Sequence, residues 1–80
     1  MSNQARPLLT PTQWLVLERL AAGESNAAIA LSLGLATGTV ASHLQAIYQR
    51  LPHANKGGKR AVAVAWYWTV GRAQHEEEAR

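Results

Sequence analysis

Residues 25–51, SNAAIALSLGLATGTVASHLQAIYQRL, decide the fold of this chain. Ser25 is a residue type that caps helix starts, and Gly34 suits the left-handed position just beyond a helix end, so the sequence predicts a short helix over NAAIALSL. After the link Gly34-Leu35-Ala36, a second helix is expected from about Thr37 to Leu51. Two short helices joined by a glycine turn are typical of a helix-turn-helix.

The second of these helices has one apolar face and one polar face. Its apolar residues recur at intervals of four, three and four, as one side of a helix requires: Val40, Leu44, Ile47 and Leu51. The opposite side carries small or polar residues: Gly38, Ser42, Gln45 and Gln49. A helix that enters the major groove needs such a front, because its side chains must approach the bases and hydrogen-bond their edges.

Upstream, Thr10-Pro11-Thr12-Gln13 predicts a helix start, with Thr10 as cap, Pro11 at the first helical position and Gln13 completing a capping box. This helix is expected to run to about Ala22 and to stop at Gly23. The residues expected to face inward are Val16, Leu17, Leu20 and Ala21 from this helix, and Ile29, Ala30 and Leu33 from the next one.

Downstream, PHANKGGK reads as a basic loop, and a fourth helix is expected from roughly Lys59 to Arg72. A strand is the competing interpretation, since valine, tryptophan and tyrosine favour sheets, but a lone strand would have no partner here. We therefore expect an all-α chain with an N-terminal arm (1–8), one helical domain (9–72) and an acidic tail (73–80) that forms a frayed, solvated extension.

Composition sets the broad class. The chain has 80 residues, a net charge of +3 and no cysteine, so neither a disulfide nor a thiolate metal site can staple it. The positive charge lies before residue 73, because three of the five acidic residues are in the tail. A basic body suits a polyanion. No segment approaches the roughly 18 apolar residues of a membrane span, so a soluble, cytoplasmic protein is expected.

From Leu9 to Leu51 the sequence resembles the LuxR-type (GerE-like) helix-turn-helix family, and the likeness resumes at Ala61-Val62-Ala63. The matching pieces are Leu9-Thr10-Pro11, Val16-Leu17, Ala21-Ala22-Gly23, Ser25-Asn26, Ile29-Ala30, Leu33-Gly34-Leu35, Thr39-Val40, His43, Ile47-Tyr48 and Leu51. The resemblance implies a four-helix domain whose third helix reads DNA and whose fourth often dimerises. It leads us to expect a stand-alone transcription regulator that binds double-stranded DNA.

The resemblance also implies site residues. Carried over by position, the base contacts are Ala41, Ser42 and Gln45. Phosphate contacts are expected from Ser25, Asn26 and Thr39, and from the basic residues flanking the groove helix, namely Arg50, Lys56, Lys59 and Arg60. His43 is equally consistent with a DNA contact and with a half-buried packing role.

The fourth helix holds more aromatic surface than one small core can take. We expect Val62, Ala65, Trp66 and Thr69 to close the core, which leaves Val64, Tyr67 and Trp68 for the contact face of a homodimer. The alternative is that Trp68 folds back onto Trp14 and Leu15 within one chain.

The sequence departs from the family where it has Ala41 in place of a common lysine, and apolar residues at Trp14, Leu15, Ala28 and Leu31. These departures favour a rival function, in which the chain binds a larger regulator or RNA polymerase through an apolar surface. No catalytic chemistry is expected, since the chain has no aspartate and no cysteine and lacks a phosphate-cradling glycine motif. The three histidines have no metal-ligand spacing, and no cofactor is expected.

Overall fold

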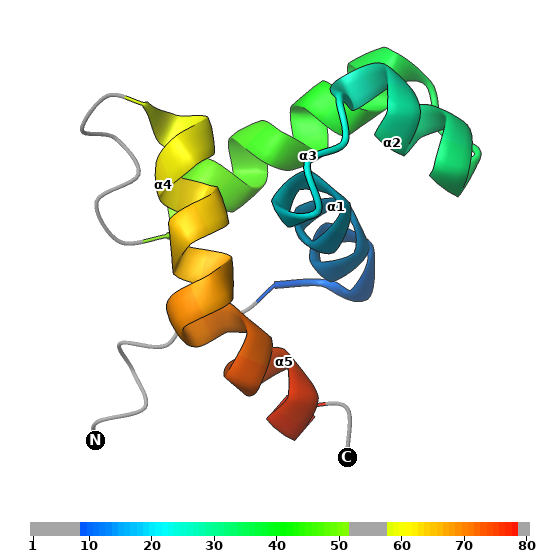
Figure 1. Cartoon of the computed structure of the whole chain (residues 1–80). Helices are drawn as coiled ribbons and strands as arrows, with labels where there is room; N and C mark the ends of the chain where they lie inside the picture. Colours follow the sequence, from blue (N-terminus) through cyan, green and yellow to red (C-terminus); the bar gives the residue numbers. More distant parts are fainter. Residues whose placement is uncertain (1–8, 52–57, 79–80) are drawn as a thin grey trace.

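A computed structural model of the chain describes residues 9–51 and 58–78, and within them the fold is all-α (Figure 1). The first three helices are α1 (Pro11–Ala21), α2 (Asn26–Leu33) and α3 (Thr37–Arg50). They are followed by α4 (Lys59–Trp66), a π-helical turn (Tyr67–Gly71) and α5 (Arg72–Glu78). The predicted helix-turn-helix, the preceding helix and a helical fourth segment are all confirmed.

The ends of the first helices have the predicted caps. The Thr10 side chain accepts from the Gln13 backbone N–H at 3.1 Å, and Gln13 Oε1 accepts from the Thr10 N–H at 2.9 Å. Ser25 Oγ accepts from the Ala28 N–H at 3.1 Å. Gly34 ends α2 with φ 68° and ψ 35°, a left-handed conformation that glycine adopts without steric cost. These local signals fix the start of α1 and both ends of α2.

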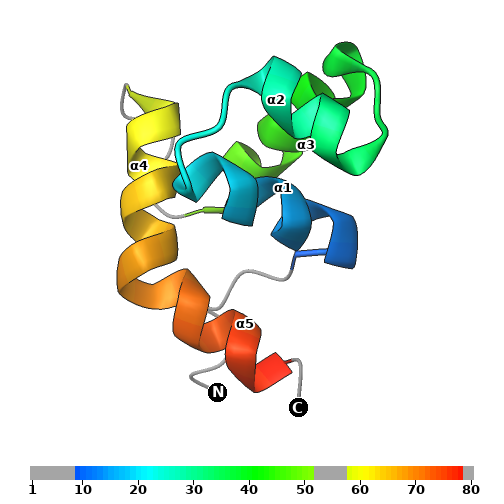
Figure 2. The same cartoon turned by 45° about the vertical axis from the view of Figure 1, so that its right-hand side comes forward.

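The core lies where α1 crosses α3, with α2 and α4 each packed against both of them (Figures 1 and 2). The largest fully buried side chains come from the predicted inward positions of the first three helices: Val16, Leu17, Ile29, Val40 and Ile47. Leu20, Ala30, Leu44 and Leu51 are buried with them. The helix-turn-helix is therefore held from behind, which leaves the other face of α3 outside the core.

The inward face of the fourth helix differs from our expectation. Trp66 is buried as predicted, but Ala65 and Thr69 are exposed, while Ala63 and Tyr67 are buried. Below Trp66 the helix widens into the π turn, in which the Arg72 N–H donates to the Tyr67 carbonyl. The buried residues of this segment, Ala63, Trp66, Tyr67, Gly71 and Gln74, still recur at intervals of three and four. The prediction therefore chose the wrong arc of the helix, and the inward face is displaced by one residue from the expected one.

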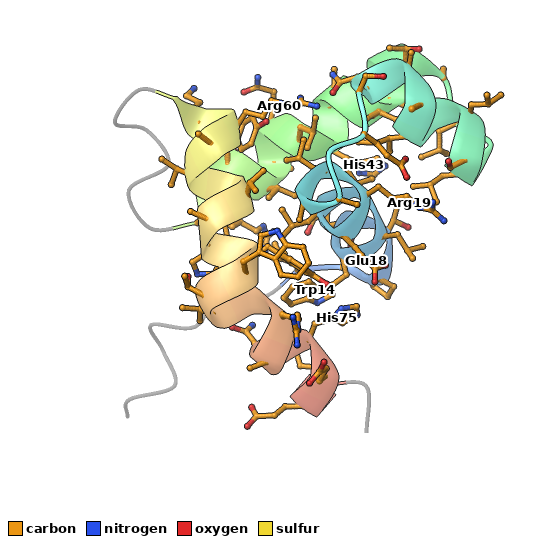
Figure 3. The ribbon with its side chains drawn as sticks, in the orientation of Figure 1. Trp14, Glu18, Arg19, His43, Arg60 and His75 are labelled. Atoms are coloured by element: carbon orange, nitrogen blue, oxygen red, sulfur yellow. The ribbon has the colours of Figure 1, made fainter. Side chains whose placement is uncertain are left out.

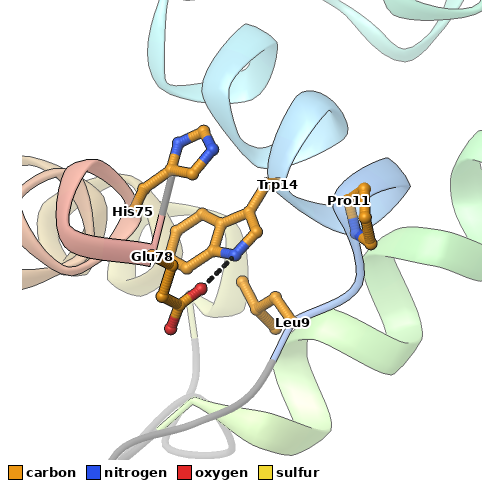
Figure 4. Close-up of a pocket in the computed structure, with 5 residues that line it drawn as sticks. All are labelled: Leu9, Pro11, Trp14, His75 and Glu78. Carbon is orange, nitrogen blue, oxygen red and sulfur yellow. Dashed lines mark hydrogen bonds between the residues drawn. The ribbon is translucent and has the colours of Figure 1, made fainter. Parts of the chain in front are cut away.

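The tail is not the frayed extension that we expected, because residues 72–78 form α5 and cover Trp14. The Trp14 ring stacks on Trp66, at 6.0 Å between centroids, and on His75, at 4.5 Å. Its Nε1–H donates to Glu78 Oε1 at 3.0 Å (Figure 4). The Gln74 side chain is also buried and donates to the other oxygen of Glu78 at 2.9 Å. The acidic end is thus tied to α1.

No single helix among the described residues is long and apolar enough to cross a membrane. The pair α2 and α3 meets the criteria of length and composition only when the two are joined across a bend of 108°.

Candidate nucleic-acid interface

The outward face of α3 exposes the residues predicted to contact bases. Ala41, Ser42 and Gln45 are all exposed, as are Thr39 and Gln49, while Val40, Leu44 and Ile47 are buried behind them. Short side chains let the α3 backbone approach a surface closely, and Ser42 and Gln45 supply hydrogen-bonding groups. This face has the shape and chemistry that readout of base edges requires.

The N-terminus of α3 is open to an external acceptor. Ala36 occupies the N-cap position and makes no side-chain cap, and Thr37, Gly38 and Thr39 are exposed. The first backbone N–H groups of a helix have no carbonyl partner inside it and lie at the positive end of its dipole. An anion such as a DNA phosphate suits this position beside Thr39.

Lys59, at the start of α4, lies beside the outward face of α3. It lines a shallow hollow of about 80 Å³ together with Gln45, Tyr48 and Gln49. Arg50, at the last position of α3, is also exposed. The structure therefore brings two of the four predicted basic contacts to the C-terminal half of α3. The third, Lys56, lies outside the described residues.

Arg60, the fourth basic residue, reaches from the first turn of α4 to the start of α2 (Figure 3). Its Nη1 donates to Asn26 Oδ1 at 2.9 Å, and its Nη2 donates to the Glu24 carbonyl at 3.1 Å. The Glu24 carboxylate pairs in turn with Arg19 of α1 at 3.2 Å. Sequence reasoning placed Arg60 and Asn26 at the same surface but did not find this connection, since nothing in the local sequence pairs residues so far apart.

Two other predicted residues have structural surroundings that bear on their roles. Ser25 is exposed but its hydroxyl already accepts the capping bond, so its remaining capacity toward a phosphate is as a donor. His43 is half-buried on α3 (Figure 3). Its burial agrees with the packing role that the sequence left open beside a DNA contact.

The residues expected at a dimer interface do not share one environment. Tyr67 is buried in the monomer, Val64 is half-buried, and Trp68 is half-exposed and meets Tyr67 edge-on at 5.3 Å. Trp68 does not fold onto Trp14; its Nε1–H donates to the Ala21 carbonyl at the end of α1, at 3.2 Å. The guanidinium carbon of Arg72 lies 5.6 Å from the centre of the Trp68 ring. Half of the Trp68 side chain remains available on the outer side of the helix.

Burial of Tyr67 raises the pKa of its phenol above the usual value, and the nearby carboxylates of Glu18 and Glu76 add to this effect, while Arg72 opposes it. These four residues and His75 together line one hollow. Within residues 9–51 and 58–78, no three His, Asp or Glu side chains are placed to hold a metal ion.

Comparison with known proteins assigns the family. The profile of the GerE family, described as "Bacterial regulatory proteins, luxR family", matches residues 7–64. Over 48 residues the chain is 46% identical to the Escherichia coli (strain K12) protein named "Putative HTH-type transcriptional regulator YhjB". That alignment covers 60% of this chain and 24% of the relative. No solved structure gives a significant match. Because the family profile spans well over half of the residues, including all of α1, α2 and α3, this chain belongs to the luxR family of bacterial regulatory proteins.

Proposed function

We propose that this chain is a sequence-specific DNA-binding transcription regulator, which acts in the cytoplasm as a homodimer and places α3 in the major groove. One observation carries the proposal. α3 buries its apolar side against α1 and α2 and exposes Ala41, Ser42 and Gln45 on the other side. Membership of a family of bacterial regulatory proteins supports the same conclusion. The proposal includes no catalytic step and no cofactor.

Each proposed base contact has a chemical preference. Gln45 can pair bidentately with adenine, Ser42 can bond to an edge donor or acceptor, and the Ala41 methyl suits the methyl group of thymine. A good bidentate pair discriminates against the wrong base by about 1–3 kcal/mol. Sequence preference should therefore depend most on Gln45.

The proposed phosphate contacts surround this face at three places. Thr39 lies at the open N-terminus of α3, Ser25 and Asn26 lie at the start of α2, and Arg50 and Lys59 lie at the end of α3 and the start of α4. Lys56, which is outside the described residues, is proposed to join them, and Arg60 is proposed to act here through its bond to Asn26. Such contacts fix orientation and affinity but carry no base information. Together they make binding dependent on salt, because each neutralised phosphate releases counterions.

The test is selection of duplexes from a random pool, followed by a salt titration on the selected site. We expect a motif to emerge, and affinity to fall with a log–log slope of about −0.9 per phosphate neutralised. Failure to enrich any sequence, or an affinity that does not respond to salt, would reject the DNA-binding function.

The homodimer is proposed on the outer side of α4 and the π turn, around Val64 and Trp68, with Tyr67 supporting Trp68 from behind. Trp68 and Val70 are each 50% exposed, and aromatic surface of this kind is a common anchor of interfaces. A two-fold axis would use the same patch on both chains and present two copies of α3. Sedimentation should show a dimer for the wild type at micromolar concentration and a folded monomer for Trp68→Glu. A wild type that stays monomeric both free and on DNA would exclude this interface.

A second candidate function keeps the fold but uses an apolar surface to bind a larger regulator or RNA polymerase. The observation in its favour is the exposure of Leu31, at 86%, and of Leu15, at 45%. Trp14 no longer supports this candidate, since α5 covers it. Two results together would favour the second function. The wild type would select no DNA, and it would bind purified RNA polymerase in a way that Leu31→Ser abolishes.

A further inference from the structure

We propose that Arg60 is a positioning residue, which orients the Asn26 amide toward a DNA phosphate instead of contacting the phosphate itself. The inference deepens the proposed function and rests on it. Its basis is the pair of hydrogen bonds from one guanidinium, at 2.9 Å to Asn26 Oδ1 and at 3.1 Å to the Glu24 carbonyl. These bonds join the first turn of α4 to the residues on either side of Ser25.

The chemistry of the guanidinium dictates which way the Asn26 amide faces. Arginine has donors only, so the oxygen of the amide must face Arg60. The amide nitrogen of Asn26, with its two N–H groups, then points away from the guanidinium. Without Arg60, the oxygen and the nitrogen of this side chain could exchange places by rotation, and an oxygen facing a phosphate would repel it.

The start of α2 supplies further donors in the same place. Ser25 Oγ takes the Ala28 N–H, and the Ser25 carbonyl takes the Ile29 N–H. The earlier N–H groups, of Asn26 and Ala27, lie in the first turn, where a helix offers no carbonyl partner. Asn26 is only half-buried. Its side-chain N–H groups therefore add to a set of backbone donors that favours an anion.

The same geometry restricts direct contact between Arg60 and DNA. A bidentate bond to phosphate uses two parallel N–H groups of the guanidinium. In this structure Nη1 and Nη2 each donate one of their two N–H groups to an acceptor of the protein, so two bonds hold the guanidinium against the start of α2. To turn this edge of the guanidinium toward a phosphate, Arg60 would have to release Asn26 or the Glu24 carbonyl. The neighbouring Lys59 points to the hollow beside Gln45 and provides a comparison in the same turn.

The experiment compares Arg60→Lys, Arg60→Ala, Asn26→Ala and the double variant Asn26→Ala/Arg60→Ala on the selected duplex across a range of salt. Lysine keeps the charge but cannot reproduce the planar fork that holds two acceptors. We expect Arg60→Lys and Arg60→Ala to weaken binding by a similar factor, roughly ten- to a hundredfold, as for loss of one hydrogen bond to a charged group. In the Asn26→Ala background, Arg60→Ala should have almost no further effect. The salt slope of the single variant Arg60→Ala should equal that of the wild type.

Lys59→Ala is the matched control, since it removes a charge one residue away and should lower the magnitude of the salt slope by about 0.9. Circular dichroism and thermal unfolding establish that each variant is folded at the binding temperature. The proposal is overturned if Arg60→Lys binds within about twofold of the wild type while Arg60→Ala lowers the salt slope as Lys59→Ala does. Additive losses for Asn26→Ala and Arg60→Ala would also overturn it. A wild type that selects no duplex would instead reject the proposed function on which it rests.

Discussion

Replacement of Trp14 by alanine should cost this domain a large part of its stability, because the structure buries this side chain on both faces. Trp14 is 4% exposed, between Trp66 and His75, and its Nε1–H is bonded to Glu78. The substitution would remove the contact that holds α5 to α1. A simple solvated tail would make no such contribution.

The magnitude follows from the buried surface. An aromatic side chain buries about 150–250 Å², and at about 25 cal/mol per Å² this amounts to roughly 4–6 kcal/mol as an upper estimate. Truncation of a buried tryptophan to alanine typically costs about 3–5 kcal/mol. A chain of this length is expected to have only about 4–12 kcal/mol of unfolding free energy in all. Trp14→Ala should therefore leave the domain marginally folded.

The assay is urea unfolding followed by circular dichroism, with two companion variants. Leu15→Ala is the control from the same helix, since Leu15 is 45% exposed, and it should cost about 1 kcal/mol or less. Trp14→Phe keeps an aromatic ring but loses the hydrogen bond to Glu78, and should cost about 1–2 kcal/mol. If Trp14→Ala is no more destabilising than Leu15→Ala, α5 does not cover Trp14 in solution and the described packing is incorrect.

Two further predictions concern the turn between α4 and α5. Gly71→Ala should destabilise the domain by about 1–3 kcal/mol in thermal unfolding, because a Cβ there collides with the Trp66 ring. Gly38→Ala in α3 is the control: its Cβ meets no atom within 4 Å, and the substitution should stabilise the domain by up to about 1 kcal/mol. The pKa of the Tyr67 phenol is raised in the folded state, so the folded chain holds this proton more tightly than the unfolded chain does. The contribution of Tyr67 to the free energy of unfolding is therefore fully present below the unfolded pKa of about 10, and it is lost as pH rises through the folded pKa. Urea unfolding at several alkaline pH values should show a smaller loss for Tyr67→Phe than for Tyr48→Phe, and equal losses would contradict this origin.

The sequence predicts the fold well where short-range signals decide it. Thr10, Ser25 and Gly34 act through bonds to residues a few positions away, and the apolar repeat of α3 needs only the geometry of a helix. For the same reason the exposure of Ala41, Ser42 and Gln45 could be expected from their place opposite that repeat. These features depend on no contact between distant parts of the chain.

The features that sequence reasoning missed all depend on such contacts. The π turn lies where the Trp66 ring packs closely against Gly71, and no pattern in the sequence predicts it. The tail has the composition of a solvated segment, but residues 72–78 form α5 and pack on Trp14. The bond from Arg60 to Asn26 joins residues on either side of α3 in the sequence. In each case tertiary packing decides the outcome.

The central claim, that the outward face of α3 reads bases, is tested most directly by Gln45→Ala. Affinity is measured for the wild type, Gln45→Ala and Lys59→Ala on the selected duplex and on every single-base variant of it. The account predicts that Gln45→Ala loses discrimination at one position, by about 1–3 kcal/mol, and keeps it elsewhere, while Lys59→Ala weakens all duplexes by a common factor. A Gln45→Ala protein with the full discrimination profile of the wild type would contradict the placement of α3 in the major groove.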